Sequence, residues 1–257
     1  MPIEAQTASL RVLLLGGTGE AHEIATRLTG LPGLTIISSL AGRVATPRLP
    51  AGLIRIGGFG GVSGLTTYLV QEQIGVVIDA THPFAVNISR NAEAACTKLG
   101  LPLIAFERPP WTKVDGDYWY EVPDMESATL RIAERKGRCL LAIGRQEVSA
   151  FAGCNDTWFL IRAIDPPQDP MPPHTQIILQ RGPFDLQQEL TLLRESTIDY
   201  VVSKNSGGAA TYSKIEAARI LGIPVIMIQR PLKHTVPALH HLEGVLAALR
   251  TMERGDR

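Results

Sequence analysis

Short apolar runs alternate with amphipathic stretches along most of the chain. Ten of these runs are rich in valine, isoleucine and leucine and have the length of a strand: residues 11–15, 34–38, 54–58, 76–80, 101–106, 138–144, 158–164, 175–180, 200–204 and 224–229. Continuous apolar strands that are separated by helices are typical of parallel sheets covered on both faces. The pattern therefore predicts an α/β fold with two Rossmann-like domains, each built on a parallel sheet, and a cleft between them.

The segment 108–124 has five of these runs before it and five after it. Its mixture of proline, aromatic and acidic residues is typical of a domain junction. We therefore predict one domain in residues 1–113, which binds the cofactor, and a second in residues 114–257, which binds the substrate. Helices are predicted in residues 19–30, 63–75 and 210–222, each ending at a glycine, with a final surface helix in residues 236–252.

The composition narrows the class of protein. Hydrophobic residues make up 45% of the 257 residues, which is enough to bury a substantial core, and the formal net charge of zero argues against nucleic acid or an anionic membrane as partner. No apolar run approaches the ~20 residues that span a bilayer. The apolar segment at residues 10–17 is too short for a signal peptide and lacks a cleavage site. We expect a cytoplasmic monomer or weak homo-oligomer whose partner is a small molecule.

The three cysteines, Cys96, Cys139 and Cys154, are far apart and form no Cys-x-x-Cys pair. Their odd number and spacing favour reduced, buried thiols over a disulfide framework or a metal site.

A glycine turn follows the first apolar run. Gly16, Gly17 and Gly19 let the backbone approach a pyrophosphate, and the helix that begins there attracts anions. We expect Thr18 to add a hydroxyl to the phosphate contacts and Glu20 to lie beside them. The match to G-x-G-x-x-G is incomplete, because His22 occupies the last glycine position. A tight turn without a ligand is the alternative.

The end of the second run indicates the type of cofactor. An NAD site usually places an acidic residue about 20 residues after the glycines. This chain instead has Ser38, Ser39 and Arg43 there. Hydroxyls and a guanidinium suit a 2′-phosphate, so NADPH is predicted over NADH. The alternative is that Arg43 is a solvated loop residue.

Two further strand ends are candidates for the same site. Gly58 belongs to a second glycine cluster and either lines the cofactor or serves only the turn. Asp79 and Thr81 stand at the end of the fourth run, where the nicotinamide is expected, and Asp79 is expected to orient the loop. His82 is a candidate donor to the substrate, and Pro83 is expected to open a helix. A structural His-Pro turn is the alternative.

Six apolar runs end at or near a cation: Arg108, Arg145, Arg162, Arg181, Lys204 and Arg230. In open parallel sheets, ligands bind at the carboxyl ends of the strands. The sequence therefore predicts a basic rim and a ligand with several carboxylates or phosphates. Surface salt bridges would explain any one of these cations.

Residues 200–204 also satisfy Tyr-x-x-x-Lys, a pair used by short-chain dehydrogenases. That pair requires a helix, where residues four apart are neighbours. We expect a strand here, which would separate Tyr200 and Lys204 by roughly 13 Å, and reject the dyad.

Several motifs, in this order and spacing, resemble the precorrin-6A reductase family of cobalamin biosynthesis: LLLGGTGEA, GGFGG, IDATHPFA, AIGRQE, RGPF, VVSKNSGG and AARILGIPVIMIQRP. The resemblance extends roughly from Val12 to Pro231, and DATHPFA and SKNSGG are its most distinctive parts. It implies two Rossmann-like domains, with NADPH in the N-terminal one and the macrocycle in the cleft. It also implies hydride transfer from NADPH to one double bond, which converts precorrin-6A to precorrin-6B.

The many carboxylates of such a macrocycle account for the basic rim. Lys204 is the expected catalytic residue, either as proton donor or as carboxylate clamp. The remaining substrate-binding candidates are His82, Arg145, Arg181, Ser203, Asn205, Ser206, Gly207 and Arg230. Whether the macrocycle carries cobalt is left open, and no metal ligands are expected in the protein.

Two other classes of function compete with this assignment. One is an NADPH oxidoreductase of another polyanionic metabolite, and the other is a non-catalytic NADP sensor or tetrapyrrole carrier. A sensor needs the glycine turn but no basic rim, whereas a carrier needs the rim but no glycine turn. The presence of both favours an enzyme.

Overall fold

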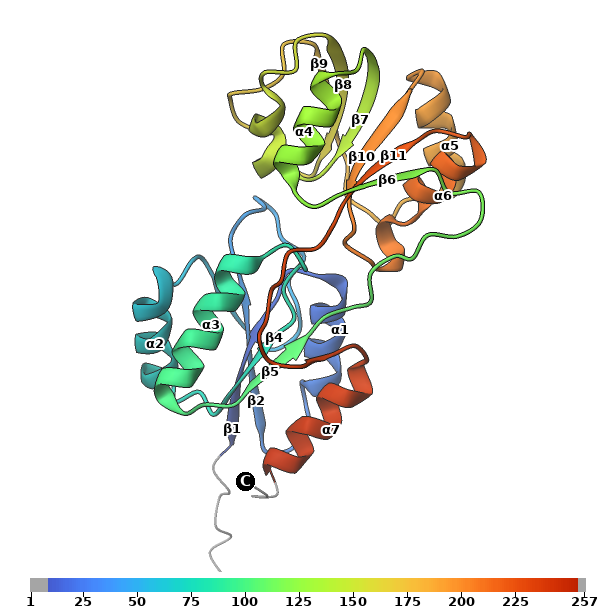
Figure 1. The fold of residues 1–257 in the computed structure, drawn as a ribbon. Coiled ribbons are helices and arrows are strands. Elements are labelled where there is room, and N and C mark those ends of the chain that lie inside the picture. Colours follow the sequence, from blue (N-terminus) through green and yellow to red (C-terminus); the bar gives the residue numbers. More distant parts are fainter. Residues whose placement is uncertain (1–8, 254–257) are drawn as a thin grey trace, which may run out of the picture. The chain divides into compact units, whose positions relative to one another are not determined.

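The computed structural model describes residues 9–253, which pack into two compact units (Figure 1). Unit 1 contains residues 9–108 and 232–253, and unit 2 contains residues 109–231. Each unit contains a six-stranded sheet in which every pair of neighbouring strands is parallel. The predicted α/β class with two parallel sheets is confirmed.

The sheet of unit 1 has the strand order of a doubly wound dinucleotide-binding fold. Its strands are β1 (Leu10–Leu15), β2 (Leu34–Leu40), β3 (Leu53–Ile56), β4 (Val76–Asp79), β5 (Leu103–Phe106) and β12 (Ala238–Leu239). The order is β3-β2-β1-β4-β5-β12. The chain runs outward from β1 to β3 and then returns to the other side of β1. The carboxyl ends of β1 and β4 therefore form the switch point, where such sheets bind ligands.

Helices cover both faces of this sheet. They are α1 (Gly19–Leu28) and α7 (Leu242–Glu253) on one face, and α2 (Gly61–Gln71) and α3 (Val86–Leu99) on the other. Val12 of β1 packs with Ile24 of α1 and Val245 of α7. The next residue along the strand, Leu13, packs with Leu65 of α2. Buried residues on both faces explain why the strands read as continuous apolar runs.

The C-terminal segment corrects two expectations. Residues 232–253 were expected in the second domain, but β12 pairs with β5 and α7 packs in the core of unit 1. The expected surface helix is present as α7, which exposes Ala247 and Arg250 while Val245 and Leu249 are almost fully buried. The helix is shorter than predicted, since the first part of 236–252 forms β12. The burial of these apolar residues places the segment with unit 1.

Unit 2 repeats the same kind of sheet. Its strands are β6 (Trp119–Val122), β7 (Gly137–Ala142), β8 (Thr157–Ala163), β9 (Thr175–Leu179), β10 (Tyr200–Lys204) and β11 (Val225–Ile228), in the order β6-β11-β10-β7-β8-β9. Its helices are α4 (Met125–Ala133), α5 (Leu186–Glu195), α6 (Ser213–Ile220) and the 3-10 segments η1 (Arg145–Phe151) and η2 (Ala209–Thr211). The chain reverses direction between β7 and β10, so their carboxyl ends form a second switch point.

One strand of unit 2 lies inside the predicted junction. β6 occupies Trp119–Val122, and both of these end residues are buried. The surrounding prolines and acidic residues concealed it in the sequence. The three cysteines are buried and form no disulfide, as expected. No helix within residues 9–253 is long and apolar enough to cross a membrane.

Candidate functional site

The glycine turn of unit 1 has the predicted strand–turn–helix geometry. β1 ends at Leu15 and α1 begins at Gly19. Gly17 has a φ of +106°, which favours glycine, and a side chain added at Gly17 or Gly19 would meet no atom within 4 Å. The backbone of the turn is therefore open at the point where the helix directs its first amide groups outward.

Thr18 and Glu20 have roles in the protein itself. Thr18 caps α1, because its hydroxyl accepts from the Ala21 amide at 3.1 Å, and it also donates to the Ala80 carbonyl at 2.9 Å. Glu20 forms an ion pair of 2.7 Å with Arg108. Thr18 thus ties the glycine turn to the loop after β4, and Glu20 neutralises one of the predicted rim cations. Both residues line a small hollow at the switch point.

The three residues expected at the 2′-phosphate are not equivalent. Ser38 and Ser39 lie within β2 and are 1% and 5% exposed. The expectation that the Ser38 hydroxyl meets a phosphate is corrected, because both faces of this sheet are covered. Arg43 lies in the exposed loop between β2 and β3. Of the three, only Arg43 offers a polar group at the surface.

Arg55 on β3 is a residue that the sequence interpretation missed. Its guanidinium donates to the carbonyls of Gly57 at 2.5 Å and Gly58 at 2.8 Å, and it lies 3.7 Å over the ring of Phe59. Through these two hydrogen bonds, Arg55 holds the backbone of the second glycine cluster in place. An arginine two residues before paired glycines was the available signal.

The loop after β4 begins with a buried carboxylate. Asp79 is 0% exposed, and its Oδ1 accepts from the amide and the hydroxyl of Thr81 at 2.9 and 2.6 Å. His82 is half-buried, and its Nδ1 accepts from the Phe84 amide at 3.3 Å. Helix α3 begins at Val86, three residues later than expected, because a turn occupies the residues after His82. Asp79 orders this loop, as its expected orienting role requires.

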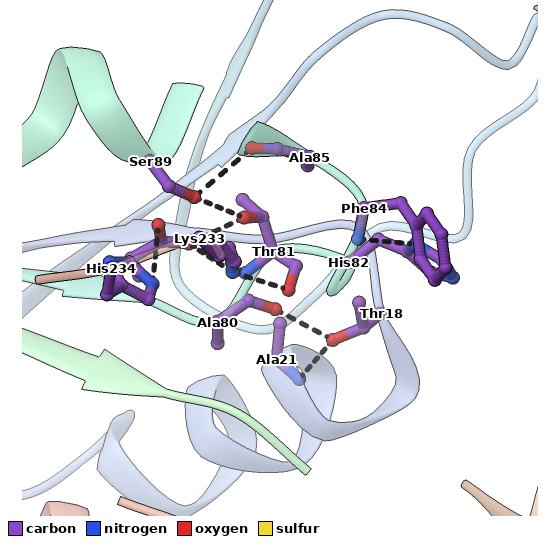
Figure 2. Close-up of polar contacts among 11 residues, drawn as sticks. Thr18, Ala21, Ala80, Thr81, His82, Phe84, Ala85, Ser89, Lys233 and His234 are labelled. Carbon is purple, nitrogen blue, oxygen red and sulfur yellow. Dashed lines mark hydrogen bonds and ion pairs between the residues drawn. The ribbon is translucent and has the colours of Figure 1, made fainter. Parts of the chain in front are cut away.

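Lys233 and His234 complete this cluster, and the sequence interpretation did not find them. Lys233 Nζ lies 3.4 Å from Asp79 Oδ1 and donates to the Thr81 carbonyl at 3.1 Å. His234 Nε2 lies 3.4 Å from Asp79 Oδ2. Figure 2 shows both side chains directed toward the loop that carries Thr81. Burial lowers the pKa of Lys233 and also that of His234, while Asp79 acts in the opposite direction on both.

The switch point of unit 2 holds a second ion pair. Lys204, the last residue of β10, is 9% exposed, and its Nζ lies 2.5 Å from Oε1 of Glu147. Glu147 lies in η1, which follows β7. Lys204 and Glu147 therefore meet where the strand order reverses. Glu147 was missed, because an acidic residue was not expected among the cations.

The turn after Lys204 is held mainly by other parts of unit 2. Asn205 Oδ1 accepts from the Trp111 amide at 2.8 Å, and Nδ2 donates to the Trp111 carbonyl at 3.0 Å. Arg230 donates to the carbonyls of Asn205 at 2.7 Å and Pro109 at 3.1 Å. A side chain at Gly207 would approach the Pro109 carbonyl to 2.1 Å. Asn205, Gly207 and Arg230 thus build the turn, and their expected contacts with a substrate stay a prediction.

The two serines of this turn are also covered. Ser203 is 1% exposed and its hydroxyl donates to the Lys204 carbonyl at 3.3 Å, so its expected contact with a substrate is corrected. Ser206 is 8% exposed, and its amide donates to the Lys204 carbonyl at 2.7 Å. Both serines support the backbone at Lys204.

The six predicted rim cations differ in their surroundings. Arg162 is buried inside unit 2, where Nη1 and Nη2 donate to the Glu189 carboxylate and the guanidinium lies 4.1 Å over Phe184. Arg108 belongs to unit 1. Arg145 is half-buried near Asp165, at 4.0 Å, and Arg181 is exposed after the edge strand β9. Arg145, Arg181 and Lys204 remain as candidates for an anionic ligand in unit 2.

The structure also confirms that the Tyr-x-x-x-Lys match is coincidental. Tyr200 and Lys204 are the two ends of β10, and the Tyr200 hydroxyl is buried beside Thr157. Within residues 9–253, no three His, Cys, Asp or Glu side chains gather closely enough to hold a metal ion.

Comparison with known proteins gives a consistent answer. The family model described as "Precorrin-6x reductase CbiJ/CobK" matches residues 11–250. A precorrin-6A reductase of Rhodococcus erythropolis is 47% identical over 95% of this chain and 99% of its own length. One of Rhodobacter capsulatus is 45% identical over 93% of this chain and 95% of its own length.

More distant and structural relatives extend this comparison. A cobalt-precorrin-6A reductase of Methanothermobacter thermautotrophicus is 28% identical, over 89% of this chain and 79% of its own length. A solved structure titled "CobK precorrin-6A reductase" superposes with a TM-score of 0.89 at 45% identity, covering 94% of this chain and 96% of that one. A match over residues 11–250, with relatives that align along nearly their whole length, shows that the chain belongs to the precorrin-6x reductase CbiJ/CobK family.

Proposed function

We propose that the protein reduces precorrin-6A to precorrin-6B with NADPH as the reductant, in cobalamin biosynthesis. The observation that carries the proposal is the open glycine turn at the β1–β4 switch point in a chain of a reductase family. A hydride and a proton add across one double bond of the macrocycle. When bound, NADPH supplies the hydride and leaves as NADP⁺.

The geometry of unit 1 fits this cofactor. The uncrowded backbone at Gly17 and Gly19 and the first turn of α1 suit a pyrophosphate. At the end of β2 no acidic side chain stands where NAD sites hold a ribose hydroxyl, and Arg43 is exposed nearby for a 2′-phosphate. Thr18, Asp79 and Thr81 serve by holding the turn and the loop after β4 together. Arg55 does the same for Gly58.

We assign the binding of the macrocycle to unit 2. Lys204 has a carboxylate partner at 2.5 Å, which is the same chemical group that an acetate or propionate of the substrate offers. We therefore assign Lys204 to binding a substrate carboxylate in exchange for Glu147, with Arg145 and Arg181 as further anion contacts. His82 in unit 1 is retained as a donor to the substrate. The alternative role of Lys204 as proton donor predicts different kinetics.

The relatives favour a cobalt-free substrate. Those that are 45–48% identical carry the name precorrin-6A reductase, whereas those at 28–29% carry the name cobalt-precorrin-6A reductase. The ratio of kcat/KM for the cobalt-free and the cobalt-containing macrocycle tests this preference. A higher value for the cobalt form would overturn it.

The main test follows the absorbance of NADPH while purified protein is mixed with precorrin-6A. The expected result is oxidation of NADPH that requires both protein and macrocycle, with a product that has gained one hydride and one proton. NADH in place of NADPH should support a lower kcat/KM. Binding of NADPH or macrocycle without turnover would instead support a sensor or a carrier.

A further inference from the structure

Three buried ionisable groups of unit 1 lie behind the proposed cofactor site without forming part of its surface. Asp79, Lys233 and His234 have side chains that are 0%, 0% and 2% exposed. None of them can touch a ligand in this structure. A buried carboxylate and ammonium are costly unless they serve each other and their neighbours, so their contacts indicate what they do.

These contacts form a continuous path to the glycine turn. Lys233 Nζ contacts both Asp79 Oδ1 and the Thr81 carbonyl, at 3.4 and 3.1 Å. Asp79 Oδ1 in turn accepts from Thr81 at two positions. Between them, the Ala80 carbonyl accepts from Thr18, which caps α1 (Figure 2). One ammonium thus fixes the backbone on both sides of Ala80.

His234 lies beside the other oxygen of the Asp79 carboxylate. Its Nε2 is 3.4 Å from Asp79 Oδ2, and neither of its ring nitrogens has a hydrogen-bond partner among the described residues. The ring therefore acts by filling space beside Oδ2. It leaves Oδ1, with its three donors, as the oxygen that orders the loop.

We infer that Lys233 and His234 are positioning residues, which act through Asp79 to hold the 79–82 loop against Thr18 at the place where the cofactor binds. The inference rests on the proposed use of NADPH. It assigns a role to the two residues that directly follow the return of the chain from unit 2 to unit 1 at Leu232. Without Lys233, Asp79 Oδ1 loses its ammonium partner and the Thr81 carbonyl loses its donor, so the loop that supports the glycine turn is held less firmly.

The test measures NADPH affinity by fluorescence titration of the full chain and stability by urea unfolding. Lys233→Met should raise the Kd for NADPH about tenfold or more, the equivalent of one charge-assisted hydrogen bond. Lys214→Met is the matched control. Lys214 is 4% exposed in unit 2 and donates to the Thr211 carbonyl at 2.7 Å, so its loss should lower stability but leave the NADPH Kd unchanged.

A second variant covers the case in which Lys233→Met does not fold. Asp79→Asn with Lys233→Met removes both charges and leaves no unpaired ion, while the contact to the Thr81 carbonyl is still lost. It should fold and still bind NADPH more weakly than the wild type. Wild-type affinity in the folded variants, or an equal loss in Lys214→Met, would overturn the inference.

Hydrogen exchange separates this inference from the cofactor assignment. If the wild type does not bind NADPH, the assignment itself fails. The Ala80 and Thr81 amides, which donate to the Leu15 carbonyl and to Asp79 Oδ1, should still exchange faster in Lys233→Met and not in Lys214→Met. Unchanged exchange at both amides would show that Lys233 does not position the loop.

Discussion

Lys233 Nζ lies 3.4 Å from Asp79 Oδ1, and neither side chain is exposed although 154 residues separate them in the sequence. Each charge loses its hydration on burial, and the other charge compensates for part of that loss. The two are therefore stable as a pair, whereas either one alone is an uncompensated charge in the core of unit 1. Loss of one partner should cost more than loss of both.

This relationship gives a prediction for stability. Lys233→Met should lower the free energy of unfolding by about 3–5 kcal/mol, because it leaves the Asp79 carboxylate buried and unpaired. The double variant Asp79→Asn, Lys233→Met should lose less. Urea unfolding at neutral pH measures both. A double variant that is less stable than Lys233→Met would show that the two charges do not compensate each other.

The pH dependence of stability should depend on His234. Burial lowers its pKa below the usual value of about 6.5, so the native state keeps it neutral while the unfolded chain takes up a proton. The unfolded state then binds more protons, and stability falls as the pH decreases below about 6.5 toward the lower native pKa. The charged groups that act on His234 are Asp79, Lys233, Glu107 and Glu93.

His234→Phe keeps an aromatic ring and removes the titrating nitrogens. It should reduce the slope of the unfolding free energy below about pH 6.5 by up to about 1.4 kcal/mol per pH unit. Urea titrations at several pH values measure this slope. The same slope in the wild type and in His234→Phe would contradict the assignment of this acid sensitivity to His234.

Substitutions at Gly207 and Gly222 distinguish the cost of a left-handed backbone conformation from the cost of a steric clash. Gly207 and Gly222 both have a φ of +66°, but a side chain would meet the Pro109 carbonyl at 2.1 Å only at Gly207. Gly222→Ala should cost about 1 kcal/mol, the usual penalty of the left-handed region. Gly207→Ala should cost roughly 3 kcal/mol or more, because the Pro109 backbone must also move. Equal losses in urea unfolding would mean that the contact with Pro109 is easily relieved.

Arg162 should matter for stability and not for substrate affinity. It is buried with Glu189, and removing one partner leaves a buried charge. Arg162→Met should lower the free energy of unfolding by about 3–5 kcal/mol, and Arg162→Met with Glu189→Leu should recover most of it. The KM for precorrin-6A of the folded double variant should equal that of the wild type. A raised KM would return Arg162 to the group of substrate-binding cations.

Local patterns were sufficient to predict much of this fold. The glycine turn at Gly16–Gly19 and the strand that ends at Lys204 are each specified by adjacent residues, so their element type could be read from the sequence. The ends of α1 and α6 could also be predicted, because Gly30 and Gly222 come shortly after the last helical residue. Neighbouring residues determine such features, and distant contacts do not change them.

Features that depend on distant contacts could not be predicted. β12 has two residues, and only its pairing with β5 makes it a strand. Lys233 follows Leu232 and belongs to no recognisable motif, since its partner Asp79 is brought to it by the fold. The strand-end rule also failed for Arg162, because the rule gives the edge of the sheet but not whether a side chain is buried by a later helix such as α5.

The ion pair of Lys204 with Glu147 separates the two roles left open for that lysine. If Lys204 binds a substrate carboxylate, Lys204→Met should raise the KM for precorrin-6A about tenfold or more and leave kcat unchanged. Glu147→Gln should lower that KM, because the substrate no longer competes with the protein's own carboxylate. Lys113→Met, at an exposed lysine of the same unit, is the matched control and should behave as the wild type. Steady-state kinetics at saturating NADPH measures all three variants. A fall in kcat of Lys204→Met at saturating precorrin-6A would instead identify Lys204 as the proton donor, since that contribution acts in the transition state and substrate concentration cannot restore it.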